Sequence, residues 1–303
     1  MTVTELISKV FLPISLAIIM LGMGMGLMPS DFTRIVKYPK AILIGLTNQF
    51  ILLPIIGFSL AVSFDLNPTT AVGLIILASC PGGVVSNLIT RVCKGNIALS
   101  VTLTAIASVL SIITIPFILS FAIEYFGKGT DLIINLPILD TIVQIMIIVV
   151  IPISTGMLIL RLKPHFAKRM KKPMHFASIF IFVLVFIAVI ISNLSLIGNA
   201  LMEVGFVTLI LNIITMGVSY LVSKLLKLNI ENTISITIES GIQNGALAFV
   251  IATSILNNIE MAIPTVAYTI WMFLTGGLLM WQLGKCPNTS LKQVNEANPN
   301  HVD

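Results

Sequence analysis

The feature that most constrains this chain is a series of apolar stretches, separated by short polar segments and each long enough to cross a bilayer as a helix. Such a helix needs about 20 mostly apolar residues. Helix is also the default spanning structure, because it satisfies its backbone hydrogen bonds internally. Nine transmembrane helices are expected, with these approximate bounds: Val10–Met28, Lys40–Phe64, Thr70–Val92, Ile97–Phe126, Pro137–Leu160, Phe176–Ile197, Val204–Leu225, Ile230–Leu256 and Met261–Gly284.

Composition excludes an ordinary soluble domain. Hydrophobic residues make up 57% of the 303 residues and charged residues only 10%, whereas a soluble domain carries roughly 25% charged residues. The net charge of +5 does not indicate a nucleic-acid partner, because the basic residues lie in short loops between apolar stretches. We expect one membrane unit over residues 1–285 and a short cytoplasmic tail at residues 286–303.

The first apolar stretch and the cysteines exclude two other features. Val10–Met28 is longer than the apolar region of a signal peptide, which has about 7–15 residues, and no Ala-x-Ala-like site follows it. Cys80, Cys93 and Cys286 have neither metal-ligand spacing nor the pattern of a disulfide framework. The sequence therefore predicts a retained first helix and three free thiols.

The basic residues give a test of the helix count. Nine helices put the two termini on opposite sides, and we place the C-terminus in the cytoplasm. The cytoplasmic side then receives 15 of the 17 basic residues: Arg34, Lys37, Lys40, Arg91, Lys94, Arg161, Lys163, Lys168, Arg169, Lys171, Lys172, Lys224, Lys227, Lys285 and Lys292. Only Lys9 and Lys128 lie outside. This bias is the one that the positive-inside rule predicts, so we expect an N-out, C-in protein of the plasma (inner) membrane.

Two of the nine stretches contain residues that interrupt a helix. The third contains Cys80–Gly83, with a proline and paired glycines, followed by Ser86 and Asn87. The eighth contains Glu239–Gly245, with two glycines, a carboxylate and two amides. Proline removes a backbone donor and glycine weakens a helix. Both helices are expected to unwind near mid-membrane, where unwound backbone is tolerated only inside protein or beside a wet cavity.

Glu239 is the sharpest chemical clue. Of the 12 acidic residues, it alone lies near the middle of an apolar stretch. An ionised carboxylate at that depth requires a cation or hydrogen-bonding partners. The alternative is a protonated or hydrogen-bonded glutamate with a structural role only.

The spacing of the two interruptions predicts an inverted repeat. They fall in the third and eighth helices, five helices apart, so the two helices run in opposite directions through the membrane. An inverted-repeat transporter has this layout. Two crossing, broken helices would bring half-helix N-termini together, which suit an anion, and carbonyl and side-chain oxygens, which suit a small hard cation.

Other polar residues lie at membrane depth. Ser100, Thr104, Ser108 and Ser111 recur at helical spacing on one face of the fourth helix, and Gln49 is an isolated amide in the second. Hydroxyl groups at this spacing also serve simply to join neighbouring helices. The residues alone leave both roles open.

These motifs resemble the bile acid:sodium symporter (BASS) family. The resemblance extends over nearly the whole membrane portion, to about Gly284. It is carried by these segments: Ser79–Asn87, Lys94–Thr104, Glu239–Asn244, Met25–Leu27 with Asp31–Phe32, and Pro39–Lys40 with Gln49–Phe50. The chain is similar to bacterial members that have ten helices, with the first of the ten missing.

The resemblance implies two sodium sites and two moving domains. One sodium site would use Ser86, Asn87, Ser100, Thr104 and Glu239. The other would use Gln49, Glu239, Gln243 and the backbone carbonyls of Ser240 and Ile242. A panel domain would contain the helices near residues 10–28, 137–160 and 176–197, and a core domain those near 40–126 and 204–284.

The resemblance transfers less well to the substrate. Val84 and Val85 stand where the family often has a hydroxyl residue, and Met272 and Phe273 follow Trp271 where it can have polar residues. Together with Asn244 and Gly245, these four residues are the expected substrate-binding positions. Their identity does not specify a substrate.

The expected function is sodium-coupled uptake of a small organic anion, such as a bile-acid-like or pantoate-like carboxylate, by a monomer that works by alternating access. A proton-coupled anion carrier or an exporter is the main alternative. An intramembrane enzyme is disfavoured, because no HExxH motif and no pair of mid-membrane aspartates occurs. A channel is disfavoured by the absence of fourfold repetition.

Overall fold

The computed structural model describes residues 10–129, 136–167 and 194–284, together with scattered positions between 169 and 191. Across these residues the regular structure is helical, and the one bridge between extended segments pairs Gly82 with Gln243. Five helices are long and apolar enough to cross a membrane: Pro39–Ser63, Ile97–Gly127, Ile138–Leu162, Val204–Leu225 and Glu260–Gly284. The structure confirms an all-α fold that suits a membrane, while the count of nine helices remains a prediction.

The elements follow one another along the chain with short connections. The α-helices are α2 (Leu12–Gly24), α3 (Pro29–Thr33), α4 (Pro39–Thr47), α5 (Leu53–Ser63), α6 (Pro68–Ser79), α7 (Val84–Val92), α8 (Ile97–Gly127), α9 (Ile138–Ile145), α10 (Ile151–Leu162), α12 (Leu194–Leu225), α13 (Ile230–Gly241), α14 (Gly245–Val250) and α15 (Ile263–Gly284). Shorter 3-10 segments are η2 (Arg34–Val36) and η6 (Glu260–Ala262).

Three wider π-helical segments are η3 (Asn48–Leu52), η4 (Met146–Val150) and η5 (Ile251–Ile255). η3 and η4 each join two α-helices into one rod, and each precedes a proline, Pro54 or Pro152. A proline cannot donate the usual backbone hydrogen bond, so the preceding turn widens. η3 contains Gln49, so this widened turn carries one of the predicted site residues.

Both predicted interruptions are present. α6 ends at Ser79 and α7 begins at Val84, so the break coincides with the proline and the two glycines. α13 ends at Gly241 and α14 begins at Gly245. Local sequence chemistry therefore located both breaks correctly.

Two predicted boundaries are wrong. The first helix, expected over Val10–Met28, is helical from Val10 but ends at Gly24, and the chain turns before Pro29. A break was expected between Ile197 and Val204, but α12 runs through these positions without interruption. Four of the six intervening residues are good helix formers and none is proline, so nothing there stops the helix. Most of the predicted Phe176–Ile197 helix lies outside the described residues.

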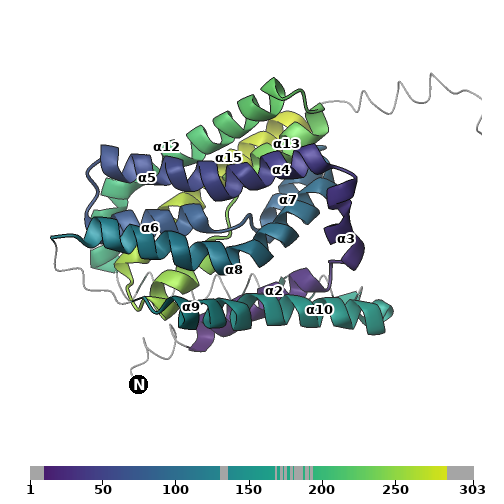
Figure 1. The fold of residues 1–303 in the computed structure, drawn as a ribbon, viewed down its shortest axis with the longest axis horizontal. Helices are drawn as coiled ribbons and strands as arrows, with labels where there is room; N and C mark the ends of the chain where they lie inside the picture. The colour runs from purple at the N-terminus through teal and green to yellow at the C-terminus, as the bar shows by residue number, and fades with distance from the viewer. Residues whose placement is uncertain are drawn as a thin grey trace, which may run out of the picture.

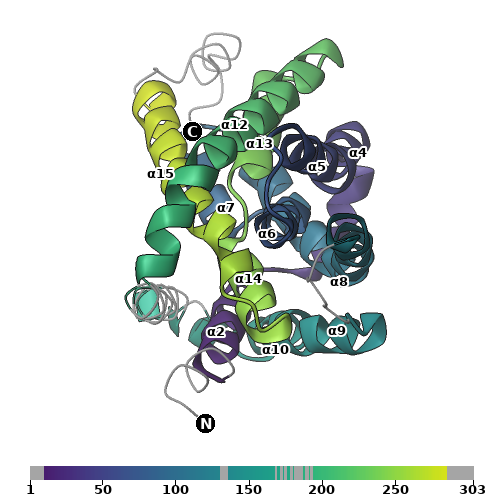
Figure 2. The same cartoon turned by 90° about the vertical axis from the view of Figure 1, so that its left-hand side faces the viewer.

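The helices form two layers. α2 packs against α10 and η4, and these elements lie with α9 along one side of the molecule in both ribbon views (Figures 1 and 2). On the other side, α12 packs against α13 and α15, while α6 packs against α5 and α8. α14 reaches α2, so the second broken helix meets both layers.

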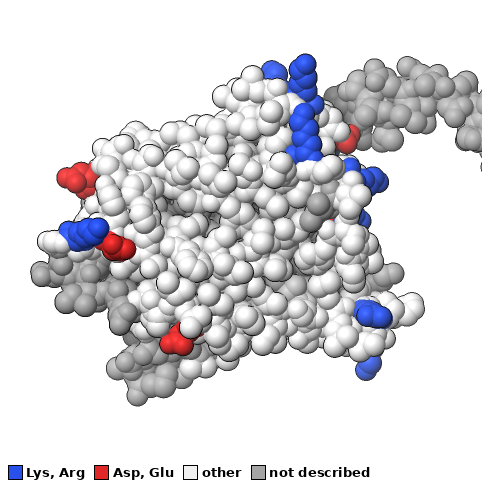
Figure 3. All heavy atoms as spheres, in the orientation of Figure 1, with Lys and Arg blue, Asp and Glu red and all other residues white. Residues whose placement is uncertain are grey.

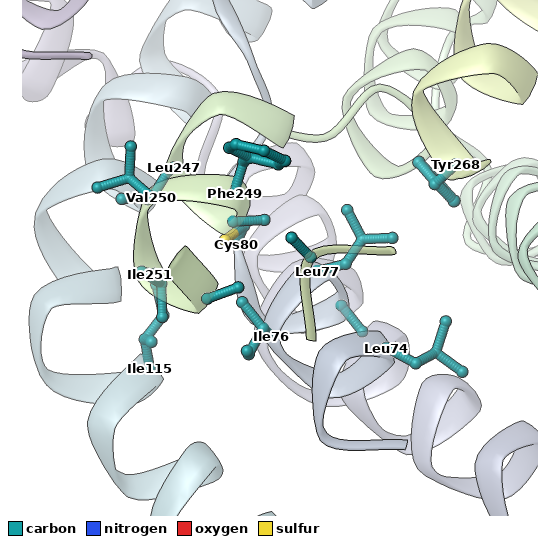
Figure 4. Close-up of a cluster of buried hydrophobic side chains, with 14 of the residues drawn as sticks. Leu74, Ile76, Leu77, Cys80, Ile115, Leu247, Phe249, Val250, Ile251 and Tyr268 are labelled. Atoms are coloured by element: carbon teal, nitrogen blue, oxygen red, sulfur yellow. The ribbon is translucent and has the colours of Figure 1, made fainter. Parts of the chain in front are cut away.

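Side chains from several helices pack around α6, which is the first half of the first broken helix. Leu74, Ile76 and Leu77 of α6 belong to one buried cluster with Phe249 and Val250 of α14 (Figure 4). In lipid the surroundings are as apolar as the side chains, so close packing contributes more than removal from water. This packing holds the broken helices in place around their polar interruptions.

On the face drawn in Figure 3, the charged side chains at the surface lie near the two ends of the molecule. Figure 3 shows a wide uncharged band, with most Lys and Arg side chains at the end where α4 begins and α10 and α12 finish. The uncharged band exposes large apolar residues such as Ile55, Ile113 and Phe117. An apolar belt between charged ends is the surface expected of a protein embedded in a bilayer.

Two glycines allow α2 and α10 to cross in backbone contact. A Cβ on Gly24 would overlap the Ile153 carbonyl oxygen, and a Cβ on Gly156 would lie 2.7 Å from the Met25 amide nitrogen. We expect Gly156→Ala to lower the free energy of unfolding by on the order of 1–3 kcal/mol, because backbone cannot move aside as a flexible side chain can. The check is the apparent Tm in detergent. Gly217→Ala in α12 is the matched control, since its Cβ would meet no atom within 4 Å; equal Tm values for both variants would contradict the prediction.

Candidate functional site

The two interruptions lie antiparallel and satisfy each other's backbone groups. The amide of Gly83 donates to the carbonyl of Ile242 at 3.0 Å, and the amide of Asn244 donates to the carbonyl of Pro81 at 2.8 Å. These bonds flank the bridge between Gly82 and Gln243. A buried backbone group without a hydrogen-bond partner is costly. Each interruption provides hydrogen-bond partners for backbone groups that the other interruption leaves outside a helix.

Glu239 lies at the centre of this crossover. Its side chain is 4% exposed, and three hydroxyl groups surround its carboxyl group. Ser86 of α7 and Ser100 of α8 donate to Oε2 at 2.7 and 3.2 Å. Thr104 of α8 donates to Oε1 at 2.6 Å. Within the described residues, the two salt bridges are Asp31–Arg34 and Glu124–Lys128, so Glu239 has hydroxyl neighbours but no paired basic side chain.

Two of these hydroxyl groups have a second acceptor within reach. Ser86 Oγ lies 2.7 Å from the Gly83 carbonyl oxygen, and Thr104 Oγ1 lies 3.0 Å from the Ser100 carbonyl oxygen. A hydroxyl group has one hydrogen to donate and lone pairs with which to accept. Each can therefore point its hydrogen either at the carboxyl group or at its own helix backbone.

Gly82 leaves the space that the carboxyl group occupies. A Cβ at this position would overlap Glu239 Oε1 and lie 2.5 Å from Cδ. The predicted interruption motif thus has a second role that the sequence did not indicate. Its first glycine, Gly82, leaves room for the Glu239 carboxyl group because it has no side chain.

Gln49 belongs to a second polar group on the same crossover. Its Nε2 donates to the Cys80 carbonyl at 2.5 Å and to Gln243 Oε1 at 2.9 Å, and Gln243 Nε2 donates to the Ser240 carbonyl at 2.8 Å. Gln49 Oε1 is buried and accepts no hydrogen bond from the described residues. Its lone pairs could accept a hydrogen bond or coordinate a cation.

The structure brings most of the predicted sodium ligands together. Ser86, Ser100 and Thr104 contact Glu239 directly, and Asn87 follows Ser86 with its Oδ1 buried and without a donor in the described part of the chain. Gln49, Gln243 and Ser240 form one hydrogen-bonded chain, while the Ile242 carbonyl accepts from Gly83. The described part of the chain holds no group of three or more His, Cys, Asp or Glu side chains placed to share a metal ion.

Five of the six predicted substrate positions lie at or beside the starts of α7 and α14, and the sixth is Phe273. Val84 and Val85 open α7 and are half-buried. Asn244 caps α14, its side chain accepting from the Leu247 amide at 3.1 Å, and Gly245 is the first residue of α14. On α15, Met272 is buried and its Cε approaches Gly245, whereas the Phe273 side chain is 52% exposed.

The sequence interpretation missed two polar residues at the second break. Asn212 of α12 and Tyr268 of α15 are fully buried, and both donate to the Gly241 carbonyl, each at 2.9 Å. Asn212 could have been found in the same way as Gln49, as an isolated amide within an apolar stretch. Tyr268 gave no such signal, because an aromatic residue in an apolar helix usually packs in the core.

Comparison with known proteins supplies the family. The model of the sodium bile acid symporter family matches residues 13–200. The chain is 32% identical over 274 residues to the uncharacterized sodium-dependent transporter YocS of Bacillus subtilis (strain 168), which covers 89% of this chain and 81% of that protein.

Two further relatives are eukaryotic. The probable sodium/metabolite cotransporter BASS1, chloroplastic, of Arabidopsis thaliana is 27% identical over 266 residues, covering 88% of this chain and 65% of that protein. The ileal sodium/bile acid cotransporter of Homo sapiens is 30% identical over 183 residues, covering 60% of this chain and 52% of that protein. The chain is a sodium-coupled, multi-pass membrane transporter and not an enzyme, and it belongs to the sodium bile acid symporter family.

Proposed function

We propose that this protein takes up a small organic anion together with two sodium ions, with Glu239 as the charged ligand common to both ions. The observation that carries this proposal is a buried carboxyl group surrounded by three hydroxyl groups at the crossing of two broken helices. Sodium is a hard cation that binds oxygen. A carboxylate, hydroxyl groups and amide oxygens provide such ligands, and no basic side chain of the described residues pairs with the carboxylate.

The first sodium site would form from Ser86, Asn87, Ser100, Thr104 and Glu239. Without the ion, the hydroxyl groups of Ser86 and Thr104 donate to the carboxyl group. When sodium enters, they turn their hydrogens to the Gly83 and Ser100 carbonyls, which already lie at 2.7 and 3.0 Å. Their lone pairs then face the ion. The empty and the loaded site are both satisfied, which suits an ion that must bind and leave.

The second sodium site would form from Gln49, Glu239, Gln243 and the carbonyls of Ser240 and Ile242. Gln49 Oε1 is the supporting feature, because it is buried without a hydrogen-bond donor in the residues that the structure describes. A buried amide oxygen without a donor costs free energy. A cation beside it would remove that cost.

The charges favour two sodium ions with a monovalent anion. Glu239 contributes one negative charge and two sodium ions contribute two positive charges, so a monoanion brings the occupied site to neutrality. Each sodium ion lowers the electrostatic cost of binding the anion, and by linkage the anion lowers the cost of binding sodium. One net positive charge then moves inward in each cycle, and the membrane potential contributes about 2.3 kcal/mol per 100 mV.

The anion would bind at the beginnings of α7 and α14, near Val84, Val85, Asn244, Gly245, Met272 and Phe273. α7 begins without a side-chain cap, so its first amide groups and the positive end of its dipole are available to a carboxylate. The apolar side chains around it favour a substrate with an apolar body. A bile-acid-like or pantoate-like carboxylate has both features, and two of the relatives are named for bile acid or metabolite cotransport.

Transport would proceed by alternating access in a monomer with nine transmembrane helices. The antiparallel crossover and the five-helix offset support an inverted repeat, in which one domain rocks against the other around a central site. The layer of α2, α9 and α10 would form part of the panel, and α4 to α8 together with α13 to α15 would form part of the core. The basic end of Figure 3 would face the cytoplasm, with the N-terminus outside and the protein in the plasma (inner) membrane.

The proposal is tested with purified protein in liposomes. We expect an inward sodium gradient to drive uptake of a labelled organic anion, and an interior-negative potential to increase it. Candidate anions are first ranked by thermal shift in sodium against potassium buffer, because a co-bound substrate should stabilise the protein more in sodium. Anion uptake that ignores the sodium gradient would refute sodium coupling. Uptake driven by a pH gradient alone would support the proton-coupled carrier instead, with Glu239 as the proton site.

A further inference from the structure

The end of α13 exposes a carbonyl that the interrupted helix cannot satisfy. In a continuous helix the Gly241 carbonyl would accept from the amide of residue 245. Here the Gly245 amide donates to the Gln243 carbonyl instead, at 3.0 Å. The Gly241 carbonyl therefore needs donors from elsewhere in the fold, since backbone freed at membrane depth has no water to bind.

Two neighbouring helices supply those donors. Asn212 Nδ2 of α12 and the Tyr268 hydroxyl of α15 each donate to this carbonyl at 2.9 Å, and Asn212 Nδ2 also lies 3.1 Å from the Tyr268 oxygen. Both side chains are fully buried. Gly241 itself packs in contact with α12, where a Cβ would lie 2.5 Å from Met216 Sδ. The carbonyl is thus held from two directions by groups that cannot exchange with water.

The first break has a counterpart of this arrangement. The bridge pairs Gly82 with Gln243, and Cys80 and Gly241 each lie two residues before the bridged residue on their own segment. Gln49 Nε2 donates to the Cys80 carbonyl as Asn212 Nδ2 donates to the Gly241 carbonyl. In both cases the amide comes from the rod that precedes the broken helix. Both amide oxygens, Gln49 Oε1 and Asn212 Oδ1, are buried without a donor among the described residues.

The held carbonyl lies between residues of the proposed sodium sites. Glu239 is two residues before Gly241, and Gln243 is two residues after it. We infer that Asn212 and Tyr268 are positioning residues that fix the Gly241 peptide so that Glu239, the Ser240 and Ile242 carbonyls and Gln243 converge on sodium. The inference deepens the proposed function and rests on it. It assigns to α12 and α15 a part in sodium binding, although neither contributes a ligand.

Tyr268→Phe removes one donor and keeps the ring. The expected result is a roughly 5- to 10-fold higher sodium concentration for half-maximal thermal stabilisation, the scale of one buried hydrogen bond. The Tm in sodium-free buffer should also fall, because the same hydrogen bond is made without sodium, and anion uptake at saturating sodium should recover. Tyr125→Phe is the matched control, because Tyr125 is exposed on α8, and its sodium dependence should equal that of the unmodified protein.

Asn212→Leu keeps the branching of the side chain at Cγ, although leucine is larger, and removes the other donor. It should raise the sodium requirement at least as much as Tyr268→Phe, and the double variant should exceed the sum of the two effects, because only the loss of both donors leaves the buried Gly241 carbonyl without a side-chain partner. Variants with a lower sodium-free Tm but an unchanged half-maximal sodium concentration would overturn the inference and leave these residues a purely structural role. If the unmodified protein shows no sodium-dependent stabilisation, it is the proposed function that fails.

Discussion

Glu239→Gln is expected to abolish sodium-dependent anion uptake, with a loss of at least roughly 100-fold. Glutamine keeps the size of the side chain and an oxygen that accepts from Ser86, Ser100 or Thr104. It removes the charge that both sodium ions are proposed to require. In a low-dielectric site a cation without its counter-charge loses several kcal/mol, and each 1.4 kcal/mol is a factor of ten in affinity. Sodium titration by thermal shift, followed by liposome uptake, measures the loss.

Glu124→Gln is the matched control for this substitution. Glu124 lies near the end of α8, its side chain is 71% exposed, and its partner Lys128 lies 3.5 Å away. An exposed pair of this kind contributes little, so uptake and sodium affinity should stay unchanged. Glu239→Ala should lose sodium binding as Glu239→Gln does, while leaving the protein folded. If either Glu239 variant kept the sodium affinity of the unmodified protein, Glu239 would not be a ligand.

Gly82→Ala should remove sodium binding with one added methyl group. The new Cβ would occupy the position of Glu239 Oε1 and lie 2.5 Å from Cδ. A flexible side chain can usually move away from such a clash, but here its movement separates the carboxyl group from Thr104 and Ser86. We expect a loss of sodium-dependent stabilisation of roughly 10- to 100-fold in apparent affinity, on the scale of the 1–3 kcal/mol that overpacking costs.

The control for Gly82→Ala is Gly277→Ala in α15, where a Cβ would meet no atom within 4 Å. The sodium-free Tm of both variants separates folding from binding. Gly82→Ala should stay folded in sodium-free buffer, because the carboxyl group can retreat while the backbone bonds of the crossover remain. Sodium affinity equal to that of Gly277→Ala would show that Gly82 does not shape the ion pocket.

The sequence predicted the two broken helices because proline and glycine act locally. It predicted Glu239 because a lone acid in an apolar stretch is conspicuous. The hydroxyl stripe of α8 required the family resemblance and proved mixed in the structure. Ser100 and Thr104 face Glu239, whereas Ser108 and Ser111 donate to carbonyls of their own helix at 2.7 and 2.9 Å.

Other features depended on contacts between residues far apart in the chain. The sequence around Gly82 and Tyr268 does not indicate which residues they contact. These contacts appear only when α13 packs against α7 and α12 and the Tyr268 hydroxyl of α15 reaches the Gly241 carbonyl. The continuity of α12 through residues 198–203 was missed for a different reason. A few polar residues in an apolar region suggest a loop, although alanine, leucine, methionine and glutamate favour helix there.

The exchange of backbone bonds between the two breaks has a consequence for biogenesis. The Gly83 amide and the Pro81 carbonyl form hydrogen bonds with the backbone of Ile242 and Asn244. These two residues are synthesised about 160 residues later. At roughly 5–20 residues per second, the ribosome needs on the order of ten seconds to deliver them. During that interval the unpaired peptide groups of the first interruption are unfavourable in lipid. The insertion machinery would therefore have to keep this segment away from the hydrocarbon. A nascent chain that stalls after α12 should therefore be a substrate for quality-control proteolysis.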